Sequence, residues 1–259
     1  MDMPPNRFLA ALREGRHLLG LWNAIPGPTA VEIAASAGFD WLVIDGEHGP
    51  IGPHDVLPAL QAAAAYPGTS AVVRPAANDP VTIKRLLDMG AQTLLIPMVS
   101  SAAEAADAVA ATRYAPEGVR GLAGIQRASR WGRVPDYAAR AADALCVLVQ
   151  VETRAGLDDL EAIAATPGVD GVFIGPADLA ASLGHAADPD HPEVRDAIAG
   201  AIERLRAAGT PAGILATDPA AARALMAAGT AFTAVGVDAM VLARALDALA
   251  ASMRDAALD

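Results

Sequence analysis

Short apolar segments and alanine- and leucine-rich helical segments alternate eight times along this 259-residue chain. Eight such repeats in about 250 residues are typical of a (β/α)8 barrel, an α/β fold whose parallel strands form a closed ring inside a ring of helices. We predict strands at Leu19–Asn23, Trp41–Asp45, Ala71–Arg74, Thr93–Pro97, Leu145–Val151, Gly171–Gly175, Ala212–Leu215 and Phe232–Val237. We predict helices at Thr29–Ala37, His54–Ala65, Val81–Met89, Ala102–Thr112, Leu157–Ala165, Pro192–Ala208, Pro219–Ala228 and Asp238–Asp255.

The residues that flank these segments agree with the alternation. Asp79-Pro80 and Asp218-Pro219 match an N-cap followed by proline in the first helical position. Glycines that can adopt positive φ follow four predicted helices, namely Gly38, Gly90, Gly209 and Gly229. The sequence contains no GxGxxG or Walker-type loop, so a doubly wound nucleotide-binding fold is the weaker alternative. We find no boundary and predict a single domain over residues 1–259.

Composition and charge exclude several classes of protein. The chain is 53% hydrophobic, which argues against disorder. The charge-free stretch Met89–Ala103 is shorter than the roughly 20 residues of a membrane span, and the first residues lack the apolar core of a signal peptide. The net charge of −11, without a block of Lys or Arg, argues against nucleic acid as a partner. We therefore expect a cytoplasmic protein whose partners include neither membrane nor nucleic acid.

Four of the predicted strands lead into residues that can carry chemistry. Asp45 and His48 follow one strand, Arg74 ends the next, and Glu152 and Asp178 follow two later strands. The carboxyl ends of the strands of a parallel barrel meet at one mouth, where barrel enzymes place their active sites. A base, a cation and carboxylates at one mouth indicate a metal-assisted enzyme that acts on an anion.

Lysine and cysteine usage narrows that chemistry. Barrel enzymes that make or break a carbon–carbon bond beside a carbonyl use either a Schiff base on lysine or a metal. The only lysine, Lys84, falls in mid-helix and faces away from the mouth, which excludes a Schiff base here. The single cysteine, Cys146, lies in an apolar strand; it excludes an intrachain disulfide and a multi-cysteine metal site. We interpret it as a small core residue.

Glu152 and Asp178 follow consecutive strands, so their carboxylates are close enough to share one cation. Carboxylate ligands with water and substrate oxygens suit Mg²⁺ or Mn²⁺. The alternative to a metal site is that Glu152 and Asp178 serve as helix N-caps or form salt bridges at the strand ends. His48 lies three residues beyond Asp45, which we expect to orient its imidazole; a helix-capping histidine is the alternative.

Arg74 suits a bidentate contact with a carboxylate and the stabilisation of an enolate oxygen, although a structural ion pair has the same signature. The segment Gly175-Pro176-Ala177 opens a short helix, and the free N–H groups of that helix are candidates for holding a substrate carboxylate. Gln150 and Leu215, near the ends of their predicted strands, complete the expected substrate-binding set.

Together these motifs resemble the HpcH/HpaI aldolase family, over nearly the whole chain and in the same order. The pattern is most similar to 4-hydroxy-2-oxoheptane-1,7-dioate aldolases and 2-dehydro-3-deoxyglucarate aldolases. The resemblance is carried by Leu42–His48, Val73–Pro75, Asn78–Pro80, Leu95–Val99, Arg127–Trp131, Val149–Thr153 and Gly171–Leu179.

The resemblance implies a class II pyruvate aldolase that reversibly cleaves a 4-hydroxy-2-oxo acid to pyruvate and an aldehyde. It implies a divalent cation (Mg²⁺, Mn²⁺ or Co²⁺) on Glu152 and Asp178, proton transfer by His48 paired with Asp45, and contact of Arg74 with the pyruvyl group. It further implies a homo-hexamer in which the C-terminal helix, here 238–255, exchanges between subunits.

Two other functions remain as alternatives. One is an acyl-CoA lyase of the citramalyl- or malyl-CoA type, for which only the arginine-bearing segment 120–133 offers cations for the CoA tail. The other is a barrel that binds a 2-oxo acid without catalysis. The segment Gly121–Gln126 differs from the Ser/Ala-rich loop that we expect of diacid-specific aldolases. We expect this loop to shape the aldehyde pocket.

Overall fold

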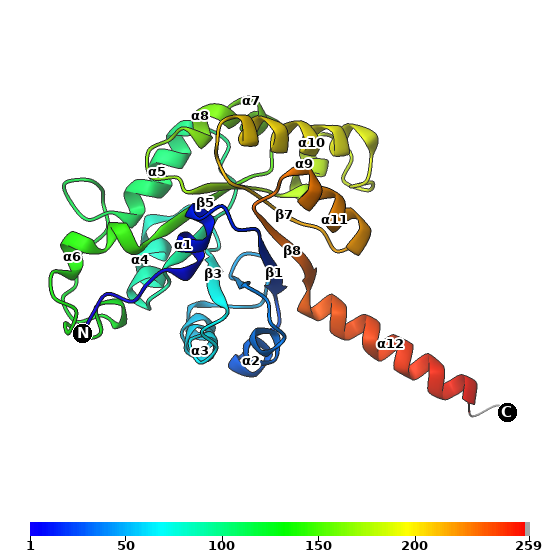
Figure 1. The fold of residues 1–259 in the computed structure, drawn as a ribbon, viewed down its shortest axis with the longest axis horizontal. Coiled ribbons are helices and arrows are strands. Elements are labelled where there is room, and N and C mark those ends of the chain that lie inside the picture. Colours follow the sequence, from blue (N-terminus) through cyan, green and yellow to red (C-terminus); the bar gives the residue numbers. More distant parts are fainter. Residues whose placement is uncertain (257–259) are drawn as a thin grey trace.

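A computed structural model describes residues 1–256 of the chain and contains a closed, all-parallel barrel of eight strands. Neighbours in the sequence are neighbours in the ring, and β1 closes it against β8 (Figure 1). The α/β barrel is therefore as predicted; the predicted domain ends at Asp259, and residues 257–259 lie outside the described part. The strands are β1 (Leu18–Asn23), β2 (Trp41–Asp45), β3 (Ser70–Arg74), β4 (Thr93–Ile96), β5 (Cys146–Val151), β6 (Gly171–Ile174), β7 (Ala212–Leu215) and β8 (Phe232–Val237).

Side chains alternate along each strand between two buried clusters, because successive strand residues point to opposite faces. The cluster inside the barrel includes Val43, Val72, Leu95, Leu148 and Phe173. The cluster between strands and helices contains their neighbours along the chain, such as Leu42, Ile44, Val73, Leu94 and Val149. Cys146 belongs to the inner cluster and is buried, as predicted.

The outer helices agree with the prediction to within one or two residues at most ends. They are α2 (Pro28–Ser36), α3 (Pro53–Ala63), α4 (Pro80–Asp88), α5 (Ala102–Thr112), α9 (Pro176–Ser182), α10 (Pro192–Ala207), α11 (Pro219–Ala228) and α12 (Asp238–Ala256). The predicted caps form: Asp79 accepts from the Thr82 N–H, and Asp218 from the N–H groups of Ala220 and Ala221. The four glycines after helices all have positive φ.

The predicted helix Leu157–Ala165 is wrong in one respect. The segment forms two short helices, α7 (Arg154–Asp158) and α8 (Leu160–Ala164), with a break at Asp159. The carboxylate of Asp159 accepts the Ala102 N–H at 2.7 Å, at the start of α5. This long-range bond and the non-helical backbone of Asp159 coincide with the break.

A further helix, α1 (Arg7–Arg13), was missed because it precedes the first strand and lies outside the repeat. Asn6 caps it, and Phe8 and Leu12 are buried in the inner cluster. The Phe8 ring meets the rings of Trp41 and Phe232 edge to face, with centroids 5.8 and 5.6 Å away. Since Trp41 and Phe232 begin their strands, α1 covers the amino-terminal end of the barrel and leaves the opposite end as the mouth.

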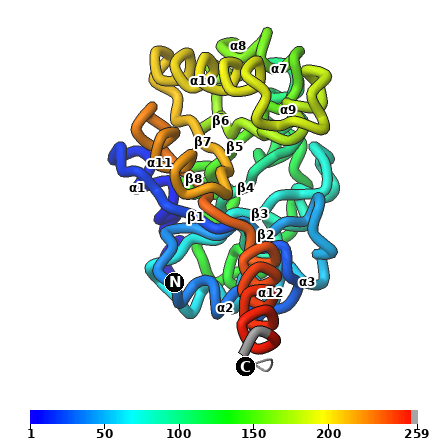
Figure 2. The backbone as a smooth tube through the Cα atoms, turned by 90° about the vertical axis from the view of Figure 1, so that its right-hand side faces the viewer, coloured from blue at the N-terminus to red at the C-terminus, as the bar shows by residue number. Residues whose placement is uncertain are grey.

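The C-terminal helix α12 leaves the barrel at the end of β8 and extends away from it (Figures 1 and 2). Large apolar side chains on it are exposed in the isolated chain, namely Met240, Val241, Leu242, Leu246, Leu249 and Met253. Among the described residues, no helix is both long and apolar enough to cross a bilayer.

Close contact across the barrel interior yields a prediction about stability. A Cβ added at Gly213 would overlap the ring of Phe232, which is fully buried. We expect Gly213→Ala to lower the free energy of unfolding by about 1–3 kcal/mol through overpacking. Gly200→Ala in α10 meets nothing within 4 Å and should raise stability by about 0.5–1 kcal/mol. Urea unfolding measures both; equal stability of the two variants would contradict this packing.

Candidate active site

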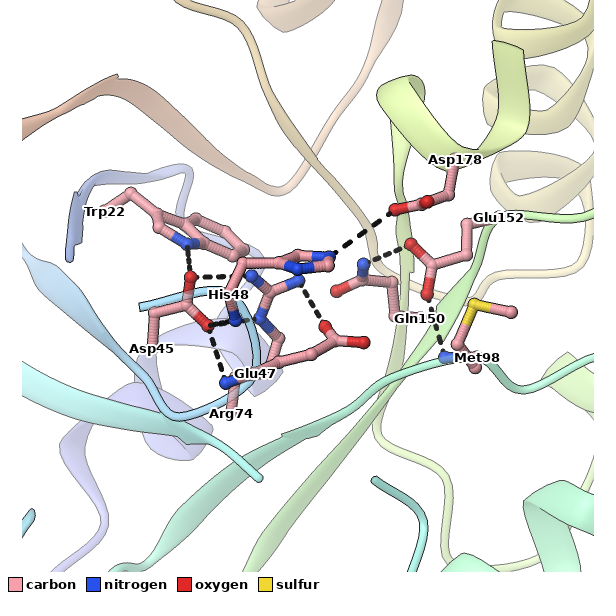
Figure 3. A network of polar contacts seen from close by, with 9 residues as sticks. All are labelled: Trp22, Asp45, Glu47, His48, Arg74, Met98, Gln150, Glu152 and Asp178. Atoms are coloured by element: carbon pink, nitrogen blue, oxygen red, sulfur yellow. Dashed lines mark hydrogen bonds and ion pairs between the residues drawn. The ribbon is translucent and has the colours of Figure 1, made fainter. Parts of the chain in front are cut away.

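The mouth of the barrel is organised around an ion pair between Asp45 and Arg74, which end adjacent strands in register. The Nε of Arg74 donates to Oδ1 of Asp45 at 2.8 Å and its NH2 to Oδ2 at 2.7 Å (Figure 3). Both side chains are buried. This bidentate geometry fixes the orientation of the guanidinium group.

Two residues that the sequence argument missed complete the surroundings of this pair. Trp22, near the end of β1, donates its indole N–H to Asp45 at 3.0 Å, and its ring lies 4.8 Å from the Arg74 guanidinium carbon. Glu47 places Oε2 at 2.7 Å from NH1 of Arg74. Trp22 lies one residue before the end of a predicted strand, and Glu47 lies between Asp45 and His48. A search extended to the neighbours of the strand ends would have found both.

The predicted pairing of Asp45 with the His48 imidazole is wrong. Asp45 Oδ1 accepts the main-chain N–H of His48 at 3.2 Å, so it fixes the backbone of the loop rather than the ring. The side chain of His48 is 64% exposed, and its Nε2 lies 3.9 Å from Asp178 Oδ2. The carboxylate of Asp45 is already occupied by Arg74 and Trp22, and the imidazole projects instead across the mouth toward α9 (Figure 3).

Glu152 follows β5 and is almost fully buried, with 1% of its surface exposed. Its Oε1 accepts the Met98 N–H at 2.8 Å, and Oε2 accepts from the Gln150 side-chain amide. Met98 has a φ of 57°, uncommon for a residue with a side chain. The carboxylate is therefore held by Met98, two residues beyond the end of β4, and by Gln150 of β5.

Gly175 is required beside this carboxylate. An added Cβ there would overlap Oε2 of Glu152 and lie 3.0 Å from the Gln150 amide nitrogen. Pro176 and Ala177 then begin α9, and Asp178 lies in its first turn. The side chain of Asp178 is about half exposed at the mouth and points toward Glu152 and His48 (Figure 3). Leu215 ends β7 and packs against the inner cluster.

The environment shifts the pKa values of the buried acids in different directions. Burial opposes ionisation of Asp45, but the hydrogen bonds and charge of Arg74 outweigh it and hold the pKa of Asp45 below its ordinary value. Burial raises the pKa of Glu152, despite the hydrogen bonds from Gln150 and Met98. Burial likewise raises the pKa of Glu47, despite the charge of Arg74.

The donor set at the mouth fits a divalent cation. Arg74 is engaged by Asp45 and Glu47, so Glu152 and Asp178 lack a nearby lysine or arginine partner among the described contacts. The Oε1 atom of Gln150 is a buried acceptor without a hydrogen-bond partner in the described part of the chain. Oxygen ligands with excess negative charge are what Mg²⁺ and Mn²⁺ prefer.

The other candidates have structural roles. Lys84 lies in the outer helix α4, away from the strand ends, with its side chain beside Gly121. In the arginine-bearing segment, Arg120 is buried, paired with Asp88 at 2.8 Å and stacked on Tyr114. Arg127 donates to the Met89 carbonyl. Arg120 and Arg127 thus interact with other parts of the fold, which argues against this segment as a binding site for a CoA tail.

Comparisons with known proteins agree with this geometry. A sequence model of the HpcH/HpaI aldolase/citrate lyase family matches residues 18–245. A pyruvate aldolase of Rhizobium etli is 57% identical over 251 residues, which cover 97% of this chain and 98% of that protein. A 4-hydroxy-2-oxo-heptane-1,7-dioate aldolase of Salmonella dublin is 55% identical over 247 residues, 95% of this chain and 94% of that protein.

The fold comparison points the same way. The crystal structure of an HpcH/HpaI aldolase/citrate lyase family protein from Burkholderia cenocepacia superposes with a TM-score of 0.92 at 43% identity, and covers 96% of this chain and 99% of that chain. The family match and the relatives named as aldolases show an enzyme of the carbon–carbon lyase class. The chain belongs to the HpcH/HpaI aldolase/citrate lyase family, and it is an aldolase.

The lowered pKa of Asp45 predicts how stability depends on pH. A carboxyl whose pKa is lower in the folded state stabilises the fold above its unfolded pKa, and this contribution is lost as pH falls through the folded pKa. We expect Asp45→Asn to reduce stability by about 3 kcal/mol at pH 7, because it leaves Arg74 without its buried counter-charge. The difference from wild type should shrink below about pH 4. Urea unfolding at pH 7 and pH 3 checks this; a difference that is constant with pH would contradict it.

Proposed function

We propose that this aldolase reversibly cleaves 4-hydroxy-2-oxo acids to pyruvate and an aldehyde through a pyruvate enolate. One arrangement at the mouth supports this most directly. Arg74 is held in place on one side, and Glu152 and Asp178, which have no lysine or arginine partner among the described residues, lie on the other. Pyruvate presents a carboxylate and a keto oxygen side by side, which require positive charge at neighbouring points. The two relatives at 55–57% identity are named as a pyruvate aldolase and a 4-hydroxy-2-oxo-heptane-1,7-dioate aldolase.

Arg74 is proposed to bind the pyruvyl group and to stabilise the enolate oxygen. Its Nε and NH2 donate to Asp45, and NH1 lies 2.7 Å from Oε2 of Glu47. A guanidinium carries five N–H donors, so further N–H groups remain for a substrate oxygen. Because the ion pair and Trp22 hold the guanidinium before substrate arrives, the donors need little reorganisation as charge develops.

His48 is proposed to transfer the proton at the C4 hydroxyl. Its ring is exposed at the mouth and faces Asp178, so substrate can reach its nitrogen atoms. In the cleavage direction the imidazole removes the hydroxyl proton, the C3–C4 bond breaks, and the electron pair passes into the enolate. Protonation at C3 then releases pyruvate. Asp45 supports this step by holding the His48 backbone and Arg74.

Glu152 and Asp178 are proposed to hold a divalent cation (Mg²⁺, Mn²⁺ or Co²⁺). When bound, the cation would supply Lewis acidity to the keto oxygen of the substrate. Gln150 orients Glu152 through its amide. The main chain at Gly175, Pro176 and Ala177 and the side chain of Leu215 are proposed to line the substrate pocket.

The loop Gly121–Gln126 is proposed to shape the aldehyde pocket, either in the same subunit or in a neighbouring subunit. Leu122 and Ile125 in this loop are 70% and 79% exposed in the isolated chain. An apolar surface of this kind favours aldehydes with an uncharged or weakly polar tail. A panel of aldehydes with pyruvate as donor identifies the preference.

Replacement of Arg74 tests the proposed reaction. We expect Arg74→Ala to lower kcat for pyruvate release from a 4-hydroxy-2-oxo acid by about 10²–10³, the usual effect of removing one donor to a developing oxyanion. Arg85→Ala, an exposed arginine of α4, is the matched control and should keep the wild-type rate. Circular dichroism verifies that both variants are folded. A folded Arg74→Ala variant with wild-type kcat would refute the assignment.

Removal of divalent cations tests the proposed metal site. We expect EDTA treatment to abolish cleavage, and Mg²⁺, Mn²⁺ or Co²⁺ to restore it, because the cation proposed on Glu152 and Asp178 supplies Lewis acidity to the keto oxygen. Asp178→Asn should weaken Mn²⁺ binding and lower the rate at saturating substrate. Full activity of a preparation shown to be metal-free would exclude this role.

The chain is further proposed to form a homo-hexamer in which α12 exchanges between subunits. In α12, Leu242, Leu246, Leu249 and Met253 lie on one exposed apolar stripe of the helix. We expect Leu249→Asp to reduce the molecular mass in solution measured by light scattering. Ala251→Asp adds the same charge on the opposite face of α12 and should leave the assembly intact. A hexamer unaffected by Leu249→Asp, or a wild-type monomer, would contradict the proposal.

A further inference from the structure

A second group of metal-ligating side chains lies outside the mouth, where the chain passes from α9 to α10. His185 follows α9, His191 is the N-cap residue of α10, and Glu193 lies in the first turn of α10. One ligand atom from each of the three residues lies within 4.8 Å of the other two. The active-site chemistry proposed above uses none of these residues.

The three side chains already converge. The imidazoles of His185 and His191 are stacked, with centroids 3.6 Å apart and planes 12° apart. Nε2 of His185 lies 2.9 Å from Oε2 of Glu193. Nδ1 of His191 accepts the main-chain N–H of Glu193 at 3.2 Å, so Nδ1 carries the lone pair that a cation would bind in place of this hydrogen bond.

The backbone of this connection is held by its own hydrogen bonds. The His185 N–H donates to the Ala180 carbonyl at 2.7 Å, and the Asp188 N–H donates to the His185 carbonyl at 2.9 Å. The His191 N–H then donates to the Asp188 carbonyl at 3.1 Å. The loop that positions the three side chains is therefore already formed without a bound ligand.

The ligand types distinguish this group from the mouth. Two imidazole nitrogens and one carboxylate oxygen form a set that Zn²⁺ prefers, with a water completing the tetrahedron. The proposed cation site at the mouth consists of the carboxylates of Glu152 and Asp178, whose oxygens suit Mg²⁺ or Mn²⁺. Arg154 pairs with Oε1 of Glu193 at 3.1 Å and leaves Oε2 directed at His185.

We propose that His185, His191 and Glu193 form a binding site for Zn²⁺ that joins the end of α9 to the start of α10. Asp178 lies in the first turn of α9, and seven residues of helix span about 10 Å. A cation bound at one end of this short helix therefore restrains the element that carries Asp178 at its other end. The site stabilises the fold and takes no part in the reaction.

Calorimetric titration of the full-length, tag-free protein with Zn²⁺ alone tests the proposal. Three variants separate the two sites. Glu152→Gln combined with Asp178→Asn removes the mouth ligands. His185→Gln combined with His191→Asn removes the imidazoles and keeps an N-cap residue for α10. His54→Gln removes an exposed histidine elsewhere and is the matched control.

We expect wild type, the mouth variant and the His54 control to bind Zn²⁺ at the α9–α10 connection with similar affinity. The imidazole variant should bind there about 100-fold more weakly or not at all. Hydrogen exchange of residues 183–193 should slow on addition of Zn²⁺ in the mouth variant and not in the imidazole variant. Unchanged Zn²⁺ affinity in the imidazole variant, or exchange of 183–193 that Zn²⁺ does not slow in the mouth variant, would overturn the proposal. Because the mouth variant lacks the proposed catalytic ligands, these results do not depend on the proposed aldol reaction.

Discussion

The buried ion pair between Asp45 and Arg74 is the interaction on which the site depends. A guanidinium buried at the end of a strand is unfavourable unless a carboxylate compensates it. The register of β2 and β3 places Asp45 opposite Arg74, and the Gly46 N–H donates to the Arg74 carbonyl just beyond the pair. Asp45 also binds the N–H groups of Glu47 and His48, so the same carboxylate that holds Arg74 shapes the loop that presents His48.

The opposite side of the mouth carries buried negative charge without a compensating lysine or arginine among the described residues. Glu152 is buried and its pKa is raised, and Asp178 adds a second negative charge nearby. Met98 and Gln150 orient the buried carboxylate without neutralising it. A cation bound there would offset the free-energy cost of the buried negative charge, and it would place positive charge across the mouth from Arg74. With such a cation, the two halves would match the two oxygens of a 2-oxo acid, as the proposed function requires.

Much of this was predictable from the sequence, because the repeat of strand and helix extends over most of the chain. Each predicted strand lies within one residue of its observed ends, and the residues that follow four of them meet at the mouth. The misses have physical causes. The helix α1 precedes the repeat, and the break at Asp159 depends on a hydrogen bond to Ala102, 57 residues away in the chain. The predicted hydrogen bond between Asp45 and the His48 ring was wrong because the spacing of two residues along a loop does not determine which group the carboxylate binds. The hydrogen bonds that Asp45 accepts from side chains come instead from Arg74 and Trp22, which lie on neighbouring strands.

The central claim is that this mouth stabilises a pyruvate enolate between Arg74 and a cation on Glu152 and Asp178. Exchange of deuterium from solvent into the methyl group of pyruvate, followed by NMR without any aldehyde, reports formation of that enolate directly. The account predicts exchange in the wild-type enzyme with Mn²⁺, and its loss in EDTA and in Glu152→Gln. Exchange that continues undiminished in a metal-free enzyme, or a wild-type enzyme with Mn²⁺ that shows none, would contradict it.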